Sequence, residues 1–340
     1  MRWTAGKAPD FWQTRFLPAM LLLPLAGLFG ILSWVRRTLY RSGLVRAAPV
    51  PVSVIVVGNI CVGGSGKTPV VAWLVERLRE TGFRPGIVSR GYGGKSSGAA
   101  LVVPDADPAI FGDEPVLLAR LTRCPVVVGA DRPAAVLSLL QAHPECNVIV
   151  SDDGLQHYRL RRDVEVVVVD ERALGNRWLL PAGPLREGLW RLRSADVIVA
   201  HGDLSSHVRE HLGAVPVASM TLEGDRLVSL GMPSETRALS DFAGMRVHAV
   251  AGIGHPERFF DQLGAMGLDI VPHAFPDHHR FSADDLAFAP GEPKILTAKD
   301  AVKCRAFAPA DTWEFPVTAQ IEPIALERIL EKLSHGRQAA

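Results

Sequence analysis

The sequence predicts an α/β protein in which a P-loop NTPase domain with a parallel sheet precedes a second, smaller α/β domain and follows an N-terminal membrane helix. Three observations lead to this prediction. A glycine-rich turn joins a β-branched run to a helical pattern, strands and helices alternate along the chain, and an uncharged run lies near the start. The length of 340 residues also favours two domains over one.

The composition excludes several classes of protein. Hydrophobic residues make up 48% of the chain, charged residues make up 21%, and the formal net charge is +1. These values exclude a disordered chain, a collagen and a nucleic-acid binder that relies on overall basicity. The four cysteines show neither metal-ligand nor disulfide spacing, which favours a reducing compartment. Nothing in the sequence identifies a protein partner.

Residues 1–46 are expected to form an N-terminal membrane-anchoring helix. Residues 16–35 carry no charge, and residues 1–50 contain seven Lys or Arg but one acid. Twenty helical residues, at about 1.5 Å each, just cover a hydrocarbon core of roughly 30 Å. A cleaved signal peptide and a soluble core helix are the alternatives. A membrane helix fits better because no face of the run is polar. Such a helix either spans the bilayer or lies deep in one leaflet, bent around Pro18 and Pro24.

A phosphate-binding turn follows the short strand at residues 52–57. Its glycines let backbone amides converge on phosphate oxygens, Lys67 is placed for the β and γ phosphates, and the Thr68 hydroxyl is placed for Mg²⁺. The usual motif has its first glycine where this chain has Cys61, so Gly63 and Gly64 must form the turn. The residues expected to bind ATP are Cys61, Val62, Gly63, Gly64, Ser65, Gly66, Lys67 and Thr68.

Residues 47–217 are expected to form the nucleotide-binding domain. Short β-branched runs alternate with helical patterns such as 114–121 and 132–142, which is typical of a parallel sheet covered on both faces. The strand at 147–151 ends in Asp152 and Asp153, where a P-loop enzyme usually holds magnesium, although an aspartate at a strand end is often only a turn former.

The remaining residues are divided between a linker and the smaller domain. Residues 218–232 are predicted to form a hairpin around a Glu-Gly-Asp turn, and residues 233–340 are predicted to form the smaller C-terminal α/β domain. The active site should then lie in the cleft between the domains, with the hairpin as a hinge.

Two common P-loop classes are excluded. A guanine-reading N-K-x-D motif is absent, and Val62 stands where partition-type ATPases carry a second lysine. A kinase-like enzyme remains, with a membrane-tethered, ATP-driven regulator of a protein partner as the alternative.

Seven motifs then identify a family. In order they are GN with VGGSGKTP (58–59, 62–69), SRGYGG (89–94), GDEP (112–115), DDGLQH (152–157), PAGPLRE (181–187), GIG with PERFF (252–254, 256–260) and FPDHH (275–279). This series resembles the tetraacyldisaccharide 4′-kinase, or lipid A 4′-kinase, family over nearly the whole chain. Two positions depart from its pattern, Gly188 in place of a proline and Ala298 in place of a glutamate.

The resemblance implies an activity and a location. The expected reaction of lipid A biosynthesis transfers the γ-phosphoryl group of ATP, with Mg²⁺, to the 4′-hydroxyl of a tetraacylated glucosamine disaccharide 1-phosphate. The family's apolar helix attaches the enzyme to the inner membrane, with the catalytic domains on the cytoplasmic side. A membrane-bound lipid substrate would explain why an ATP-using domain carries such a helix.

The resemblance also implies roles for individual residues. Asp113 is the expected catalytic base, although its place at a helix start equally suits an N-cap. His278 is its expected partner, whereas His279 is expected to be an exposed histidine. The expected magnesium ligands are Thr68, Asp152, Asp153 and Glu187, and the weaker candidates for the substrate pocket are Tyr92, Glu114, Arg132, His157 and Arg186.

Overall fold

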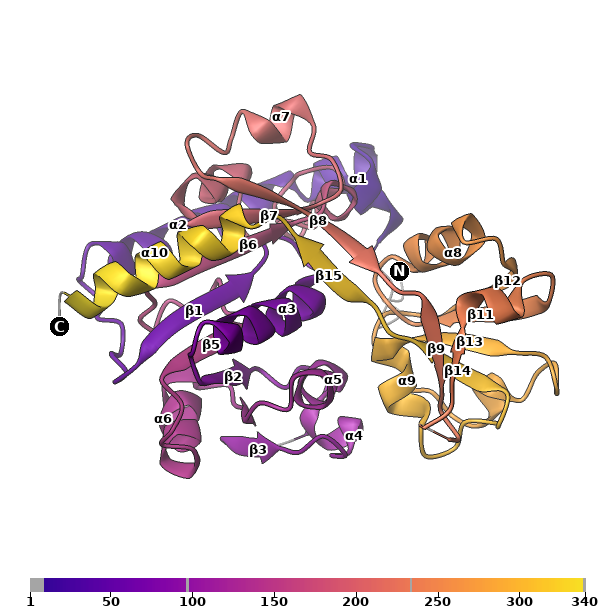
Figure 1. Ribbon diagram of the computed structural model, residues 1–340. Coiled ribbons are helices and arrows are strands. Elements are labelled where there is room, and N and C mark those ends of the chain that lie inside the picture. The colour runs from indigo at the N-terminus through magenta and orange to yellow at the C-terminus, as the bar shows by residue number, and fades with distance from the viewer. Residues whose placement is uncertain (1–8, 96–97, 233, 339–340) are drawn as a thin grey trace.

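The computed structural model describes residues 9–95, 98–232 and 234–338, which form two sheets with helices packed against them (Figure 1). The larger sheet has nine strands in the order β15-β8-β7-β6-β1-β5-β2-β4-β3, with only the edge pairs β3·β4 and β15·β8 antiparallel. Its strands are β1 (Ser53–Gly58), β2 (Pro85–Ser89), β3 (Ala100–Val102), β4 (Val126–Val128), β5 (Val148–Asp152), β6 (Val164–Val169), β7 (Val197–His201), β8 (Val217–Glu223) and β15 (Thr318–Ile321).

Helices cover both faces of this sheet with their apolar sides. The alternating residues Ile55 and Val57 of β1 pack with α3 (Lys67–Glu80), α5 (Asp113–Thr122) and α10 (Ile324–Gln338). Val54 and Val56 pack on the other face with α6 (Arg132–Ala142) and with buried residues between Leu155 and Leu212. Because successive side chains of a strand alternate between faces, a strand buried on both sides is apolar throughout, as β1 is from Val54 to Val57. The predicted parallel α/β sheet is confirmed.

A six-stranded sheet forms the second domain, in the order β10-β9-β14-β13-β11-β12. Strands β12, β11, β13 and β14 pair parallel with one another, while β9 pairs antiparallel with both β14 and β10. The elements are β9 (Arg226–Ser229), β10 (Thr236–Ala238), β11 (Arg246–Ala251), α8 (Pro256–Ala265), β12 (Asp269–Ala274), β13 (Lys294–Thr297), α9 (Ala298–Cys304) and β14 (Thr312–Phe315).

The predicted hairpin over 218–232 is wrong. Strand β8 pairs with β7 and β15 in the larger sheet, whereas β9 pairs with β10 and β14 in the smaller one. The Glu-Gly-Asp stretch therefore carries the chain from one sheet to the other and does not fold it back. Gly224 suits this crossing because a Cβ there would lie 2.6 Å from the Pro316 carbonyl oxygen.

The C-terminal segment also lies elsewhere than predicted. Strand β15 leaves the smaller domain and pairs antiparallel with β8, and α10 then packs against the larger sheet through Ala325, Ile329 and Leu333. Residues 318–338 therefore belong to the nucleotide-binding domain. Two chain segments, β8–β9 and β14–β15, connect the domains side by side (Figure 1).

The apolar run at 16–35 does not form the continuous helix that the sequence predicts. It is divided into α1 (Leu17–Leu21) and α2 (Leu23–Arg41), with a proline in the first turn of each helix. A proline that opens a helix has no N–H to continue the preceding one, which explains the break. No helix of the described residues 9–95, 98–232 and 234–338 is long and apolar enough to cross a membrane.

Helix α2 has an unusual distribution of side chains. It contacts the nucleotide-binding domain through Arg37 and through small residues, since Arg37 and Ala26 are buried and a Cβ on Gly30 would lie 2.7 Å from Leu179 Cδ1. Most of its large apolar side chains are exposed. The exposed residues of α1 and α2 include Leu17, Met20, Leu21, Leu25, Leu28, Ile31, Leu32, Trp34 and Val35.

Candidate active site

The phosphate-binding turn lies between the carboxyl end of β1 and the first turn of α3. Gly63 and Gly66 have φ angles of 104° and 84°, in the left-handed region that favours glycine. The buried Asn59 side chain supports the turn from below, because its Nδ2 donates to Ser65 Oγ at 3.0 Å and to the Gly63 carbonyl at 3.4 Å. The α3 helix begins at Lys67, so its free N–H groups face the space above the turn.

The departure at Cys61 has a structural explanation. Cys61 forms an antiparallel bridge with Leu185, and the Val62 N–H donates to the Pro184 carbonyl at 2.9 Å. This extended stretch needs no glycine. Burial raises the pKa of the Cys61 thiol to about 11, although Lys67 opposes the shift, so the thiol is neutral beside the turn.

Two carboxyl groups lie beside the turn because β5 is the neighbour of β1, with Asp152 paired to Val57. Asp153 Oδ1 lies 3.5 Å from Lys67 Nζ, and its Oδ2 accepts a hydrogen bond from Arg186 Nη1 at 3.0 Å. Burial opposes the charge of Asp153, but Lys67 and Arg186 outweigh it and hold the pKa well below its usual value. Asp153 is therefore ionised.

Asp152 has the opposite electrostatic environment. Its burial, together with the charges of Glu114 and Asp153, raises the pKa of Asp152 to about 7. Its Oδ2 accepts a hydrogen bond from Ser89 Oγ at 2.9 Å, whereas its buried Oδ1 has no partner among the described residues.

These groups fit a magnesium ion. The free Asp152 Oδ1 and the neighbouring ionised Asp153 offer the hard oxygen ligands that Mg²⁺ prefers, and Thr68 is the second residue of α3. Among the described residues no group of three or more His, Cys, Asp or Glu side chains could hold a metal. Mg²⁺ often takes only one or two carboxylates, with waters and substrate phosphates filling the remaining positions.

Asp113 and His278 lie in direct contact although they come from different domains. His278 Nδ1 lies 3.0 Å from Asp113 Oδ2 and 3.2 Å from Oδ1, as the resemblance implied. Asp113 is not the N-cap of α5, because that position is held by Gly112 with a φ of 90°. A side chain at Gly112 has no room, since a Cβ would lie 2.6 Å from the Tyr92 carbonyl oxygen.

This contact shifts the pKa of both partners. Burial opposes ionisation of Asp113, yet the hydrogen bond from His278 and the charges of Lys299 and Lys303 hold its pKa well below the usual value. Burial lowers the pKa of His278, but the hydrogen bond to Asp113 outweighs it and the net shift is upward. Asp113 is thus ionised at neutral pH and can accept a proton.

Lysines from α9 surround the pair. Lys299 Nζ lies 3.3 Å from His278 Nε2 and 3.0 Å from Glu114 Oε1, while Lys303 Nζ lies 3.9 Å from Asp113 Oδ2. Since an ammonium group only donates, its contact with Nε2 favours the imidazole that carries its proton on Nδ1. Lys299 therefore aligns His278 so that it donates to Asp113.

The predicted substrate residues fall into two groups. Arg186 is held by Asp153, Glu114 is paired with Lys299, and the exposed Tyr92 ring lies 5.1 Å from the His278 ring, so these three border the site. Arg132 is buried and donates to the Asp152 carbonyl at 2.8 Å. Burial and the nearby Arg132 lower the pKa of His157 to about 4, so it is neutral.

Glu187 is engaged elsewhere. It is almost completely buried, its Oε1 accepts a short hydrogen bond from the Tyr158 hydroxyl, and its Oε2 accepts one from Gln156 Nε2 at 3.0 Å. With both oxygens occupied, this geometry gives no support to Glu187 as a metal ligand. His279 differs from expectation too, because it is partly buried against Phe275 and Phe281.

The two domains meet above the phosphate-binding turn. A Cβ on Gly254 of the smaller domain would lie 3.0 Å from the Gly64 nitrogen. Arg258 of α8 forms an ion pair with Asp170 at 2.8 Å and a short contact with His201. Asp170 directly follows β6, and His201 is the last residue of β7, so both belong to the larger sheet's side of the contact. The GIG segment at 252–254 thus forms a cover over the turn.

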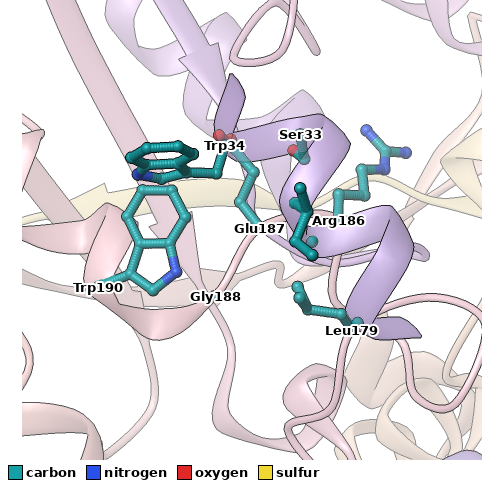
Figure 2. A pocket seen from close by; sticks show the side chains of 10 residues that line it. Ser33, Trp34, Leu179, Arg186, Glu187, Gly188 and Trp190 are labelled. Carbon is teal, nitrogen blue, oxygen red and sulfur yellow. The ribbon is translucent and has the colours of Figure 1, made fainter. Parts of the chain in front are cut away.

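A cavity of about 330 Å³ lies beside this site, between α2 and the loop that carries Arg186 and Glu187 (Figure 2). Its wall from α2 includes Gly27, Gly30 and Ile31, and the opposite wall includes Leu179, Gly188 and Trp190. Apolar side chains therefore extend from the exposed helix to the edge of the predicted site.

Comparison with known proteins decides the family. The family model described as tetraacyldisaccharide-1-P 4′-kinase matches residues 18–334. The chain is 67% identical over 336 residues to the tetraacyldisaccharide 4′-kinase of Aromatoleum aromaticum, covering 99% of this chain and all of that one. It is 62% identical to the enzyme of that name from Azoarcus sp., covering 98% and 97% of the two chains.

The chain belongs to the tetraacyldisaccharide 4′-kinase family. The resemblance predicted from the seven motifs is thereby confirmed. A crystal structure of LpxK from Aquifex aeolicus in complex with ATP is also similar, with a TM-score of 0.78 and 30% identity, over 93% of this chain and 99% of that one.

Several residues of this kinase's site escaped the sequence analysis. Asn59 belongs to the first motif but received no role, and Arg258 lies inside the PERFF motif. Lys299 received no role either, and it follows Ala298, where the sequence departs from the family pattern. A signal for Lys299 exists in the spacing Lys299-x-x-x-Lys303, which places two cations on one face of a helix.

The raised pKa of Asp152 predicts how stability depends on pH. A free aspartate ionises near pH 4, whereas Asp152 in the folded chain ionises near pH 7. Between these pH values the folded chain keeps a proton on Asp152 that the unfolded chain has released. The contribution of Asp152 to the free energy of unfolding is thus fully present below about pH 4 and is lost as the pH rises through 7. Asp152→Asn should raise the melting temperature in EDTA by a few degrees at pH 8 and by much less at pH 5.

Asp153→Asn is the matched control for this measurement. Because the ionised Asp153 is stabilised by Lys67 and Arg186, its neutral substitute should lower the melting temperature at pH 8. Calorimetry at both pH values reports the two shifts. Equal effects of Asp152→Asn at pH 5 and pH 8 would contradict the assigned pKa.

Proposed function

We propose that this chain transfers the γ-phosphoryl group of ATP to the 4′-hydroxyl of a tetraacylated glucosamine disaccharide 1-phosphate, with Asp113 as the base. The kinase activity follows from membership of the family, and the ATP-bound relative supports ATP as the donor. The observation that supports the assignment of the base is the contact at 3.0 Å between Asp113 and His278, close to the phosphate-binding turn.

Asp113 accepts the proton of the attacking hydroxyl in this proposal. Its low pKa makes it a weak base, but phosphoryl transfer depends mainly on positioning and on charge stabilisation. His278 fixes the carboxylate in one orientation, and Lys299 in turn fixes the imidazole. His278 and Lys299 are thus positioning residues, whereas Asp113 contacts the substrate.

The phosphate-binding turn and Lys67 hold the donor. Amides from Cys61 to Thr68 surround the phosphates, and the Lys67 ammonium stabilises charge on the β and γ phosphates. Thr68, Asp152 and Asp153 would hold Mg²⁺, which neutralises charge on the transferred group when bound. The 252–254 segment lies over the turn and would exclude water there, which protects ATP from hydrolysis.

In this proposal the acceptor binds on the side of Asp113 that faces away from the phosphate-binding turn. Arg186, held by Asp153 and bordering the apolar cavity, is placed to bind a sugar or phosphate oxygen. Tyr92 contacts His278 and Glu114 contacts Lys299, beside Asp113, while Arg132 donates to the Asp152 carbonyl from the buried side, with His157 near it. The acyl chains of the substrate would then pass along the cavity toward α2.

We place the enzyme on the cytoplasmic face of the inner membrane, where ATP is available. The exposed apolar face of α1 and α2 is suited to one leaflet, because an interfacial helix buries its apolar side by about 5–10 Å and leaves its other side to the protein. A spanning helix is not part of the proposal.

The activity is tested with γ-labelled ATP and the detergent-dispersed disaccharide 1-phosphate. We expect label in a lipid that carries one additional phosphate, and none in a substrate whose 4′-hydroxyl is blocked. Release of inorganic phosphate at the same rate without the lipid would contradict the kinase assignment and favour an ATP-driven regulator.

The same assay tests the base. Asp113→Ala and His278→Ala should each lower turnover by about 10² to 10⁴, the usual contribution of a positioned base. The double variant should be little worse than the poorer single one, because the two groups act as a unit. ATP affinity should change little in all three variants.

His279→Gln is the matched control, since this neighbouring histidine contacts Asp285 and not Asp113. It should retain turnover. Multiplicative losses in the double variant, or unchanged turnover in Asp113→Ala, would place the base elsewhere.

The membrane assignment is tested by replacing Leu21, Leu28 and Leu32 together with glutamine. These side chains are 70%, 54% and 61% exposed, so the fold should not suffer. Co-sedimentation with lipid vesicles should weaken by at least about tenfold, because three apolar side chains lose favourable transfer into lipid.

Glutamine at Leu101, Leu121 and Leu137 provides the control. These leucines are comparably exposed but lie on the nucleotide-binding domain away from α1 and α2. Equal loss of vesicle binding in both triple variants would show that no particular face docks on lipid.

A further inference from the structure

A second cavity lies at the C-terminal end of α2 and takes no part in the reaction described above. It has a volume of about 540 Å³ and lies between α2 and the 3-10 helix at residues Leu189–Ser194. Its lining residues are Trp34, Arg37, Arg41, Trp190, Arg193 and Ser194. We propose that this cavity binds the phosphate group of an anionic phospholipid of the membrane surface.

The charge of the cavity is the first argument. Three of its six lining residues are arginines, and none is an acid. Within the described part of the chain, Arg37, Arg41 and Arg193 form no ion pair with a carboxylate. Three cations that share one cavity without an acidic partner repel one another, and an anion placed between them relieves that repulsion.

The second argument is that the site is preorganised. Arg37 is only 8% exposed, and its Nη2 donates to Ser194 Oγ at 2.6 Å. Its guanidinium also lies 4.9 Å from the centre of the Trp190 ring. These contacts fix one arginine at the base of the cavity before a ligand arrives, which reduces the entropic cost of binding. A guanidinium fork matches two phosphate oxygens.

The third argument concerns the surroundings, which are suited to a lipid. Trp34 and Trp190 are 56% and 40% exposed at the rim, and both also line the apolar cavity beside Leu179 (Figure 2). Exposed tryptophans next to basic residues are typical of the boundary between headgroups and acyl chains. The exposed leucines of α2 continue from this rim, so a ligand here can place its tails along the helix.

Other phosphates in the reaction are less well suited to this cavity. The triphosphate belongs at residues 61–68, none of which lines it. The sugar of the acceptor must approach Asp113, whereas the arginines here come from the far end of α2 and from the segment after Glu187. The inference rests on the proposed attachment to a membrane but names a particular site in addition to the apolar face.

Binding can be measured without any bilayer, so the test does not depend on membrane docking. The full chain is titrated with dihexanoyl phosphatidylglycerol below its critical micelle concentration, and the broadening of the phosphorus NMR signal is followed. We expect saturable binding. Arg41→Gln and Arg193→Gln should each weaken it by about fivefold, the usual effect of one basic residue near a lipid phosphate.

Arg46→Gln is the matched control, because it removes the same charge from an exposed residue of the same segment that does not line the cavity. Its affinity should equal that of the unchanged chain. The Arg41 side chain forms no hydrogen bond with the described residues, so Arg41→Gln tests the site without disturbing the fold.

Several results would overturn the inference. The first is the absence of saturable lipid binding in a chain that still phosphorylates the disaccharide. The second is that Arg46→Gln weakens binding as much as Arg41→Gln does. The third is that inorganic phosphate binds as tightly as the lipid. Displacement of the lipid by glucosamine 1-phosphate would assign the cavity to the acceptor. A chain that binds the lipid but fails to phosphorylate the disaccharide would instead refute the proposed function and leave this site in place.

Discussion

The hydrogen bond between Asp113 and His278 depends on the placement of two domains. Each residue is positioned by its own sheet, Asp113 at the start of α5 and His278 in the loop after β12. A displacement of about 1 Å is enough to lose such a contact. The double connection through β8–β9 and β14–β15, together with the ion pair between Arg258 and Asp170, limits how far the domains can move apart.

The site places many charges in a poorly hydrated space, and their arrangement determines which groups are ionised. Asp113 and Asp153 each have cationic neighbours and keep their charge, while Asp152, beside two other acids, has a pKa near neutrality. A magnesium ion would compensate the charge of Asp152 and its neighbours. The mutual repulsion of these carboxylates therefore favours the binding of a cation together with the negatively charged nucleotide.

The sequence predicted those parts of the molecule that depend on local patterns. Glycine spacing and β-branched runs located the phosphate-binding turn and the parallel strands, and the carboxylates followed from the rule that functional groups gather at the carboxyl ends of such strands. The contact of Asp113 with His278 could be predicted only through the family, because 165 residues separate them.

The errors concern elements whose partners are distant in the sequence. A run such as 218–232 has the pattern of a hairpin, and only the presence of β15 and β14, some 90 residues later, assigns β8 and β9 to different sheets. The role of Lys299 was equally hidden, since its partner Glu114 belongs to the other domain. Nonlocal pairing is what single-sequence patterns do not encode.

The N-terminal helices show why hydrophobicity alone predicted one continuous membrane helix where the chain forms two shorter ones. In an ordinary surface helix the large apolar residues face the core, but α2 packs against the protein through Ala26, Gly30 and Arg37 and exposes its leucines. Small residues allow the close approach that the Gly30 contact requires, and the cost of exposing the leucines to water is removed if they enter lipid. The two prolines fit the same arrangement, because they divide the uncharged run at residues 16–35 into segments that are each too short to span a membrane. A kinase whose acceptor stays in the bilayer needs its site at the surface, and the proposed position of α2 in one leaflet, beside the cavity at Leu179, would keep the site there.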